Sequence, residues 1–401
     1  MGAATDNPEK NDGGTISGPV MQYVRSKAQA QQIPLVAMLE LTNNCNLWCR
    51  HCYICDRPAR GELALDEWKA LVERLCTMGV ASLAFTGGEP LLKEGIEELI
   101  AFAAGLTTEH IETEDGALVS RMAEQFSWKI DPKQIVPLVN LLQGLDLSVL
   151  LHSRRGEGVV LQTPLYPPFL AAVERSGRRV DESTLVRGAD RYQIDFDHLR
   201  AQLQPDTRLI LLCNPHNPTG RSFERDELLA LGELALEHDL IVVSDEIHAD
   251  LTFPPHRHVP FATLGPELAE RTITLTSATK SFNLAGLPCA FAICGSDRLQ
   301  RPFRELPPHA LGHPGILDDV ATYTAWTEGR VWLDVVRAYL LENRELVMDF
   351  FASRIPGLQV LPPEATYMVW LDCRELGLPV DPFGFFLEHA RVALTGGNEF
   401  G

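Results

Sequence analysis

Three short apolar runs in this chain each lead directly into a group of polar residues. The runs and the segments that follow them are Leu209–Cys213 with Asn214–Gly220, Leu240–Val243 with Ser244–His248, and Thr272–Leu275 with Thr276–Gly286. Short apolar runs of this kind are typical of buried strands. Because the carboxyl ends of parallel strands meet at one edge of a sheet, the pattern predicts a largely parallel sheet with one functional site at that edge.

The three polar segments supply a lysine, an acid and an amide. Lys280 lies just beyond the third run, after the small hydroxyl residue Ser277. Asp245 follows the second run and Asn217 follows the first. A lysine held partly out of water can react with an aldehyde. Pyridoxal 5'-phosphate needs such a lysine, a carboxylate for its ring nitrogen and a donor for its ring hydroxyl. We therefore predict Lys280 as the catalytic residue and Asp245 and Asn217 as cofactor-binding residues.

Around these residues the sequence resembles a known family. The segments Ser244–Asp250, His256–Phe261 and Lys280–Leu287 resemble the fold-type I pyridoxal-phosphate enzymes of the class I/II aminotransferase group, in particular the cystathionine β-lyase (C–S lyase) branch. The resemblance extends from about Ala117 to Gly401. It implies a three-layer α/β fold with a small C-terminal α+β domain, a small amino-acid substrate and a homodimer.

The same resemblance implies roles for three more cofactor-binding residues. It places His248 near the ring hydroxyl, Tyr166 on the face of the pyridine ring and Ser277 at the phosphate. Each has a structural alternative, namely a core histidine, an ordinary packed aromatic residue and a hydroxyl that caps a turn. The phosphate-binding turn of the family corresponds to Val136–Asn140, which offers few side-chain donors.

Residues 35–105 carry a second chemical signature. The strand-like run Leu35–Leu41 leads into Cys45, Cys49 and Cys52, which have the spacing C-x3-C-x2-C. Three thiolates on a four-iron cluster leave one iron open to a small chelating ligand. We predict these three cysteines as metal ligands, and the alternative is a zinc loop with Cys55 as the fourth ligand.

A Gly-Gly-Glu-Pro motif follows the cysteines. A helix is predicted over Leu65–Gly79 and a strand over Ala81–Phe85, and the motif then supplies Gly87, Gly88 and Glu89. The glycines allow the backbone to approach an amino-acid moiety, and the carboxylate can accept from its ammonium group. Together with the cysteines, the motif resembles the start of the radical S-adenosylmethionine family, which implies a [4Fe-4S] cluster and S-adenosylmethionine. Only two strand–helix units are present, so we predict a partial (β/α) module.

The two resemblances divide the chain. We predict a disordered tail at residues 1–30, the partial radical S-adenosylmethionine module at 31–106, a large pyridoxal-phosphate domain at 107–300 and a truncated small domain at 301–401. An acidic, strand-poor junction is expected at Leu106–Gly116, after a helix at Ile96–Gly105 and before one at 117–127. In the small domain we expect helices over Asp318–Ala325 and Val331–Ile355 and strands over Leu358–Val360 and Thr366–Asp372.

Charge and hydropathy restrict the partners. The formal net charge of −19 argues against nucleic acid and against an anionic membrane surface. No apolar run is long enough to span a bilayer, and no secretory signal is visible. Four of the nine cysteines lie between Cys45 and Cys55, and the others are scattered in apolar stretches. This pattern is typical of a cytoplasmic protein with a metal site and buried thiols.

The resemblance therefore implies a pyridoxal-phosphate-dependent C–S β-lyase that acts on a sulfur-containing amino acid such as cystathionine. A class I/II aminotransferase is the first alternative. The second is a non-catalytic fusion or chimeric remnant of two enzymes, because both family resemblances are incomplete at the junction where they meet. In the family, a strand with an arginine that binds the substrate carboxylate would follow the last residues of this chain.

Overall fold

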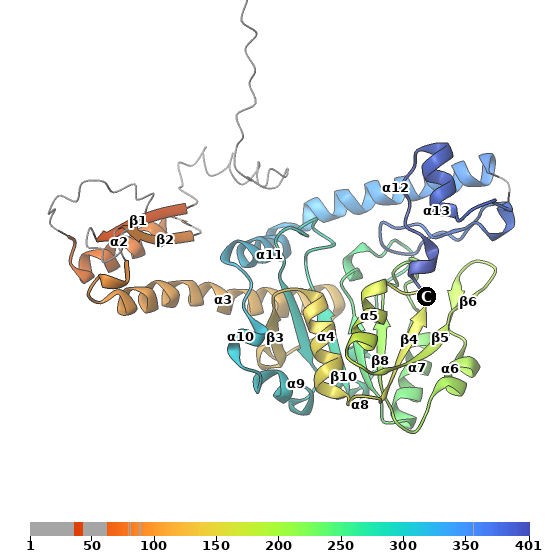
Figure 1. The fold of residues 1–401 in the computed structure, drawn as a ribbon, viewed down its shortest axis with the longest axis horizontal. Coiled ribbons are helices and arrows are strands. Elements are labelled where there is room, and N and C mark those ends of the chain that lie inside the picture. The colour runs from red at the N-terminus through yellow and green to blue at the C-terminus, as the bar shows by residue number, and fades with distance from the viewer. Residues whose placement is uncertain (1–35, 43–61, 79, 81, 88–89, 356) are drawn as a thin grey trace, which may run out of the picture. The chain divides into compact units, whose positions relative to one another are not determined.

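The computed structural model describes residues 36–42, 62–78, 80, 82–87, 90–355 and 357–401 (Figure 1). The chain falls into two compact units, Met1–His110 and Ile111–Gly401. The boundary lies within the long helix α3 (Ile96–Phe126). None of the described helices is long and apolar enough to cross a membrane.

The first unit contains a two-stranded parallel sheet. Strand β1 (Val36–Thr42) pairs with β2 (Ser82–Gly87), and helix α2 (Leu65–Thr77) lies between them in the chain. The apolar side chains of Leu41, Trp68 and Val72 meet those from the start of α3 in a small core. The predicted strand, helix and second strand of this region are thus present, within one or two residues of the expected ends.

Helix α3 differs from the prediction. We expected a helix at Ile96–Gly105, an acidic junction and a second helix at 117–127, whereas the structure has one continuous helix over Ile96–Phe126. Residues 106–115 contain no proline, and glutamate is a good helix former. The second half of the helix packs through Leu118 and Met122 against Phe291 and Ile293. Burial at this end stabilises a helix whose middle has no apolar periodicity.

The second unit is built on a seven-stranded sheet with the order β3-β11-β10-β9-β8-β4-β5. Four of its pairings are parallel and two, those of β11 with β10 and β3, are antiparallel. The prediction of a largely parallel sheet is therefore confirmed, with a mixed edge. The strands are β3 (Ile135–Leu138), β4 (Gly158–Thr163), β5 (Arg179–Thr184), β8 (Thr207–Cys213), β9 (Ile241–Asp245), β10 (Thr272–Thr276) and β11 (Ala290–Cys294).

Helices cover both faces of this sheet and give a three-layer α/β fold (Figure 1). Successive side chains of a strand point to opposite faces, so Leu209 and Leu211 of β8 enter one core while Ile210 and Leu212 enter the other. The helices on the first face are α4 (Leu141–His152), α5 (Pro167–Arg175) and α9 (Asp297–Arg304). Those on the second face are α6 (Phe196–Gln202), α7 (Arg225–Glu237) and α8 (Pro266–Ala269).

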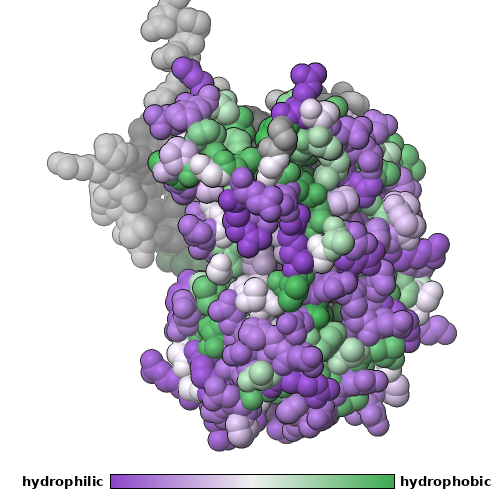
Figure 2. All heavy atoms as spheres, turned by 90° about the vertical axis from the view of Figure 1, so that its right-hand side faces the viewer, coloured by the Kyte–Doolittle hydropathy of each residue, from purple (hydrophilic) through white to green (hydrophobic). Residues whose placement is uncertain are grey.

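One face of this unit is mainly polar. Figure 2 shows the side that carries α6 and α13 (Pro382–Phe385), where hydrophilic residues predominate and apolar residues are scattered among them.

The last hundred residues are mostly helical. They contain α10 (Pro308–Leu311), α11 (Ile316–Glu328), α12 (Arg330–Arg354) and a short antiparallel pair, β12 (Gln359–Val360) and β13 (Leu371–Asp372). Two short antiparallel strands, β6 (Val186–Arg187) and β7 (Tyr192–Gln193), lie earlier in the chain. The two predicted helices and the strand at 358–360 are confirmed.

The predicted strand Thr366–Asp372 is wrong except for its last two residues. Thr366 is buried and has a φ of +74°, a left-handed conformation that no regular strand adopts. Its N–H donates to Leu251 O at 3.0 Å, and the N–H groups of Glu364 and Ala365 both donate to Gly220 O at 2.9 Å. We call residues 363–366 the strap, because these bonds tie them to the large sheet.

A buried ion pair reinforces the strap. The Arg221 guanidinium, fully enclosed, donates to the Glu364 carboxylate at 2.5 Å and also to Tyr192 O at 2.7 Å and to Glu227. An uncompensated charge in such a place would be strongly destabilising. The segment just before Tyr367 is therefore fixed to the loop that follows β8.

Candidate active site

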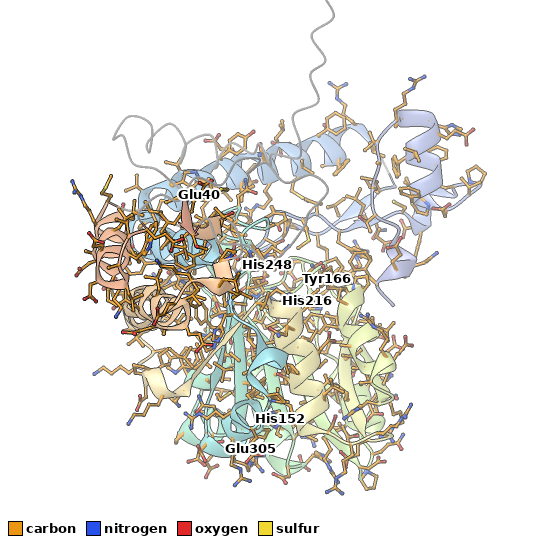
Figure 3. The ribbon with its side chains drawn as sticks, turned by 60° about the vertical axis from the view of Figure 1, so that its left-hand side comes forward. Glu40, His152, Tyr166, His216, His248 and Glu305 are labelled. Carbon is orange, nitrogen blue, oxygen red and sulfur yellow. The ribbon has the colours of Figure 1, made fainter. Side chains whose placement is uncertain are left out.

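A cavity of about 420 Å³ opens at the carboxyl ends of β8, β9 and β10. In the sheet register, Asp245 at the end of β9 is opposite Cys213 of β8 and Leu275 of β10, so the three strand ends are adjacent. Figure 3 shows His248 and Tyr166 at this end of the sheet and His152 at the other. The cavity is lined by all six residues that were predicted for pyridoxal phosphate, namely Tyr166, Asn217, Asp245, His248, Ser277 and Lys280.

Asp245 is a buried acid without an arginine or lysine hydrogen-bond partner among the described residues. Its Oδ1 accepts from the Ile247 N–H at 3.0 Å. Burial raises the pKa of this carboxyl to about 7; the Ile247 hydrogen bond and the positive charge of Lys280 lower it, and Glu246 raises it. A second cation beside the carboxylate would favour its charged form, so Asp245 is suited to bind a protonated ring nitrogen.

Asn217 offers an amide that the protein leaves open. Its backbone N–H donates to Cys213 Sγ at 3.4 Å, and its backbone O accepts from the Tyr166 N–H at 3.1 Å. The side-chain Oδ1 is buried and has no hydrogen-bond partner in the described part of the chain. Buried polar atoms nearly always have a partner, so this amide is available to a ligand.

His248 is a neutral imidazole on the cavity wall. Burial, and then the charge of Lys280, lower its pKa to about 3. Its Nδ1 is buried without a partner among the residues that the structure describes. Its ring is 5.7 Å from the ring of Tyr367, edge to face. An ordinary core histidine would have both nitrogens satisfied, so the open Nδ1 supports a contact with a ligand.

Tyr166 is held at the cavity by its backbone. It is the residue before α5, and its N–H donates to Asn217 O. The side chain is partly buried against the core on the α4 and α5 side of the sheet. Its stacking on a pyridine ring remains a prediction, because both the stacking and the packing interpretations fit this position.

The Ser277 hydroxyl is used within its own turn. It donates to Cys289 O at 2.5 Å and accepts from the Thr279 N–H at 3.1 Å. This is the turn cap that we considered as the alternative. The residue also lines the cavity, and its contact with a phosphate remains a prediction.

The segment Asn140–Leu142 was missed as a part of the site. Asn140 Oδ1 accepts from the Gln143 N–H at 2.9 Å and so caps α4, and all three residues line the cavity. The first N–H groups of a helix have no partner within it and bind anions well. A phosphate bound at this helix end would therefore need few side-chain donors. The sequence signal for this helix start is an asparagine directly before an apolar run, which is typical of a helix N-cap.

Tyr367 and Met368 are two further lining residues that were missed as site residues. Burial, and then the nearby Tyr166, raise the pKa of the Tyr367 phenol. Both residues follow the strap directly. Sequence patterns do not reveal this placement, because it depends on hydrogen bonds to Gly220 and Leu251, more than a hundred residues away.

The residues of the cavity fit pyridoxal phosphate. They provide an amine, a buried carboxylate, an open amide, an open imidazole nitrogen and a capped helix N-terminus within one cavity. A protein that bound no ligand in this cavity would be expected to provide its own hydrogen-bond partners for Asn217 Oδ1 and His248 Nδ1.

The cysteine and Gly-Gly-Glu-Pro motifs of residues 35–105 lie largely outside the described residues. Cys45, Cys49, Cys52, Cys55, Gly88 and Glu89 are all outside them, and Gly87 is the last residue of β2. No group of metal-binding side chains is found in the part of the chain that the structure describes.

Comparisons with known proteins agree with the site. A model of the family "Aminotransferase class I and II" matches residues 79–401. Cystathionine beta-lyase PatB of Bacillus subtilis is 36% identical over 328 residues, which cover 81% of this chain and 84% of the relative. Protein MalY of Escherichia coli is 30% identical and covers 71% of this chain and 73% of the relative. The crystal structure of cystalysin from Treponema denticola, which contains pyridoxal 5'-phosphate, matches with a TM-score of 0.70 and 29% identity, covering 72% of this chain and 74% of that one.

Proposed function

The chain belongs to the aminotransferase class I and II family, and from this premise we propose that it is a pyridoxal-phosphate-dependent C–S β-lyase that acts on a sulfur-containing amino acid such as cystathionine. The observation that carries the proposal is the meeting of Lys280, Asp245 and Asn217 in one cavity. These residues come from three separate segments, and each matches a need of this cofactor. The relatives named cystathionine beta-lyase support elimination over transamination.

When bound, pyridoxal phosphate withdraws the negative charge that forms at the α-carbon of an amino acid. Lys280 Nζ would hold the cofactor aldehyde at rest and then take the α-proton of the substrate. The Asp245 carboxylate would hold the proton at the ring nitrogen. Asn217 and His248 would bind the ring hydroxyl, and the N-terminus of α4 with Ser277 would bind the phosphate. Tyr166 would cover the ring.

Pyruvate release from cystathionine, compared with keto-acid exchange on the same amino acid, tests the reaction type. We expect homocysteine, pyruvate and ammonia as the products, because the homocysteine thiolate leaves the β-carbon once the α-proton is removed and water hydrolyses the remaining aminoacrylate. If exchange is faster than release, the aminotransferase alternative is correct. Protein that takes up no cofactor and releases no pyruvate would indicate a non-catalytic fusion remnant.

Tyr367→Ala is expected to raise KM for cystathionine about threefold to tenfold with a smaller change in kcat. The ring lines the cavity and contacts His248, and an aromatic contact is worth roughly 0.5–1.5 kcal/mol beyond its buried area. Steady-state pyruvate kinetics measure the effect. Tyr367→Phe, which keeps the ring, should stay close to the unmodified protein, and an equal loss in both variants would assign the effect to the hydroxyl.

Assembly and location follow from the same proposal. We expect a homodimer in the cytoplasm, with a large domain at residues 107–300 and a small one at 301–401. The charge balance and the family support these expectations. Light scattering on the purified protein measures the mass of the assembly.

For residues 31–106 the proposal is a partial radical S-adenosylmethionine module in which Cys45, Cys49 and Cys52 hold a [4Fe-4S] cluster. The parallel pair β1 and β2 with α2 between them supports it. Gly87, Gly88 and Glu89 would bind the amino-acid part of S-adenosylmethionine. Because only part of the (β/α) barrel is predicted, we expect anaerobic reconstitution to give a cluster but little 5'-deoxyadenosine. Robust formation of 5'-deoxyadenosine would contradict the prediction that the module is partial.

A further inference from the structure

Asp250 is a buried carboxylate near the site that none of the steps above uses. It lies in the 3-10 helix Ala249–Leu251, two residues after His248, and its side chain is 2% exposed. Its Oδ2 accepts from Arg121 Nη2 at 2.6 Å and its Oδ1 accepts from Gln125 Nε2 at 2.6 Å. The two donors are four residues apart and therefore lie on one side of α3. The carboxylate ties this helix to the segment that carries His248.

The arginine of this pair is also fixed on its other sides. The side chain of Arg121 is 6% exposed, and its guanidinium carbon lies 5.3 Å from the ring centres of both Phe126 and Trp326. The desolvation of two buried charges often outweighs their attraction, so such a pair is a poor source of stability. The planar guanidinium of Arg121, which contacts both rings, instead defines one position for the Asp250 carboxylate.

Asp250 is held in its charged form. Burial would raise its pKa, but the charge and hydrogen bond of Arg121, and then the hydrogen bond of Gln125, hold it below the usual range. Two segments distant in sequence, namely α3 and the loop after β9, therefore meet at one carboxylate.

We propose that Asp250, held by Arg121 and Gln125, is a positioning residue that fixes the loop carrying His248 at the cavity. The inference rests on the proposed function. The open Nδ1 of His248 has to lie within hydrogen-bond distance of the ring hydroxyl of the cofactor. A displacement of about 1 Å in such a group can cost about a hundredfold in rate. A carboxylate that contacts neither substrate nor cofactor can thus control turnover.

Two variants test this role. Asp250→Asn keeps the shape and removes the charge. The double variant Arg121→Met/Asp250→Leu replaces the buried pair with apolar side chains, a change that is often neutral for stability, and it serves where the single variant does not fold. The first readout is the rate at which the near-visible absorbance band forms when pyridoxal phosphate is added to the cofactor-free protein. The second is kcat and KM for pyruvate release.

We expect band formation and kcat to fall about tenfold to a hundredfold in both variants, with KM changed less than about threefold. The matched control is Asp181→Asn. Asp181 is equally buried and is paired with Arg179 at 2.7 Å, but it lies on the edge strand β5 and outside the cavity. Its loss should lower Tm and leave both rates unchanged.

A double variant with unchanged Tm, band formation and kcat would overturn the proposal. An equal loss of rate in the Asp181→Asn control would also overturn it, because the lower rates would then result from a general loss of stability. Unmodified protein that forms the band but releases no pyruvate would instead refute the lyase function, and the rates of band formation would still decide the role of Asp250.

Discussion

Lys280→Ala is expected to lower kcat for pyruvate release by about a thousandfold or more. Removal of a positioned proton-transfer group typically costs about 10²–10⁴ in rate, and Lys280 has a second task in holding the cofactor aldehyde. It is the lysine that lines the cavity, and its charge affects both Asp245 and His248. The measurement is steady-state pyruvate release at saturating pyridoxal phosphate.

Borohydride reduction of the cofactor-loaded protein gives an independent readout of the same residue. The mass of the reduced cofactor should appear on the peptide that contains Lys280 and should be absent in Lys280→Ala. Lys133, an exposed residue before β3, provides the control. Lys133→Ala should keep full activity and full labelling. A label on any lysine other than Lys280 would reject the assignment.

Asp245→Asn is expected to change how the stability of the cofactor-free protein depends on pH. Burial raises the pKa of Asp245 to about 7 from its ordinary value of 3.8. The folded state therefore binds this proton more tightly than the unfolded state does. The resulting stabilisation is fully present below the ordinary pKa and is lost as the pH rises through about 7. It is on the order of 4 kcal/mol for a shift of this size.

Urea unfolding at several pH values between 4 and 8 measures this effect as a difference between the two proteins. His248, whose pKa is lowered to about 3, acts in the opposite sense, because its contribution is lost as the pH falls. It is present in both proteins and largely cancels in the difference. A difference that does not change with pH would contradict the burial of a protonated Asp245. Added pyridoxal phosphate should reduce the pH dependence, because a ring cation favours the carboxylate.

The buried strands and the residues at their ends were predictable because both are encoded locally. A strand covered on two faces favours a continuous apolar run, and β8 and β9 each have one. β10 instead alternates threonine with Ile273 and Leu275, and β-branched residues of this kind are typical of strands. The polar residue after such a run has to lie at the sheet edge. This is why Asp245 and Lys280 could be placed in one site from the sequence, and why the cavity contains both.

The features that were missed depend on contacts between distant parts of the chain. Helix α3 continues through an acidic stretch without apolar periodicity because its last turns pack on β11. Thr366 leaves the predicted strand because the Leu251 carbonyl holds its backbone in a left-handed conformation. Tyr367 enters the cavity for the same reason. Residue type and spacing carry no record of such contacts.

The position of the strap in the sequence also determines when the cavity can be completed during synthesis. Arg221 and Glu364 are separated by 143 positions, and a ribosome adds about 5–20 residues per second. For several seconds, therefore, Arg221 and the Gly220 carbonyl exist without Glu364 and Ala365, and the cavity exists without Tyr367. The nascent sheet can form while one wall of the cavity is still inside the ribosome. Cofactor uptake in its final geometry therefore has to follow the emergence of the strap and Tyr367 from the ribosome.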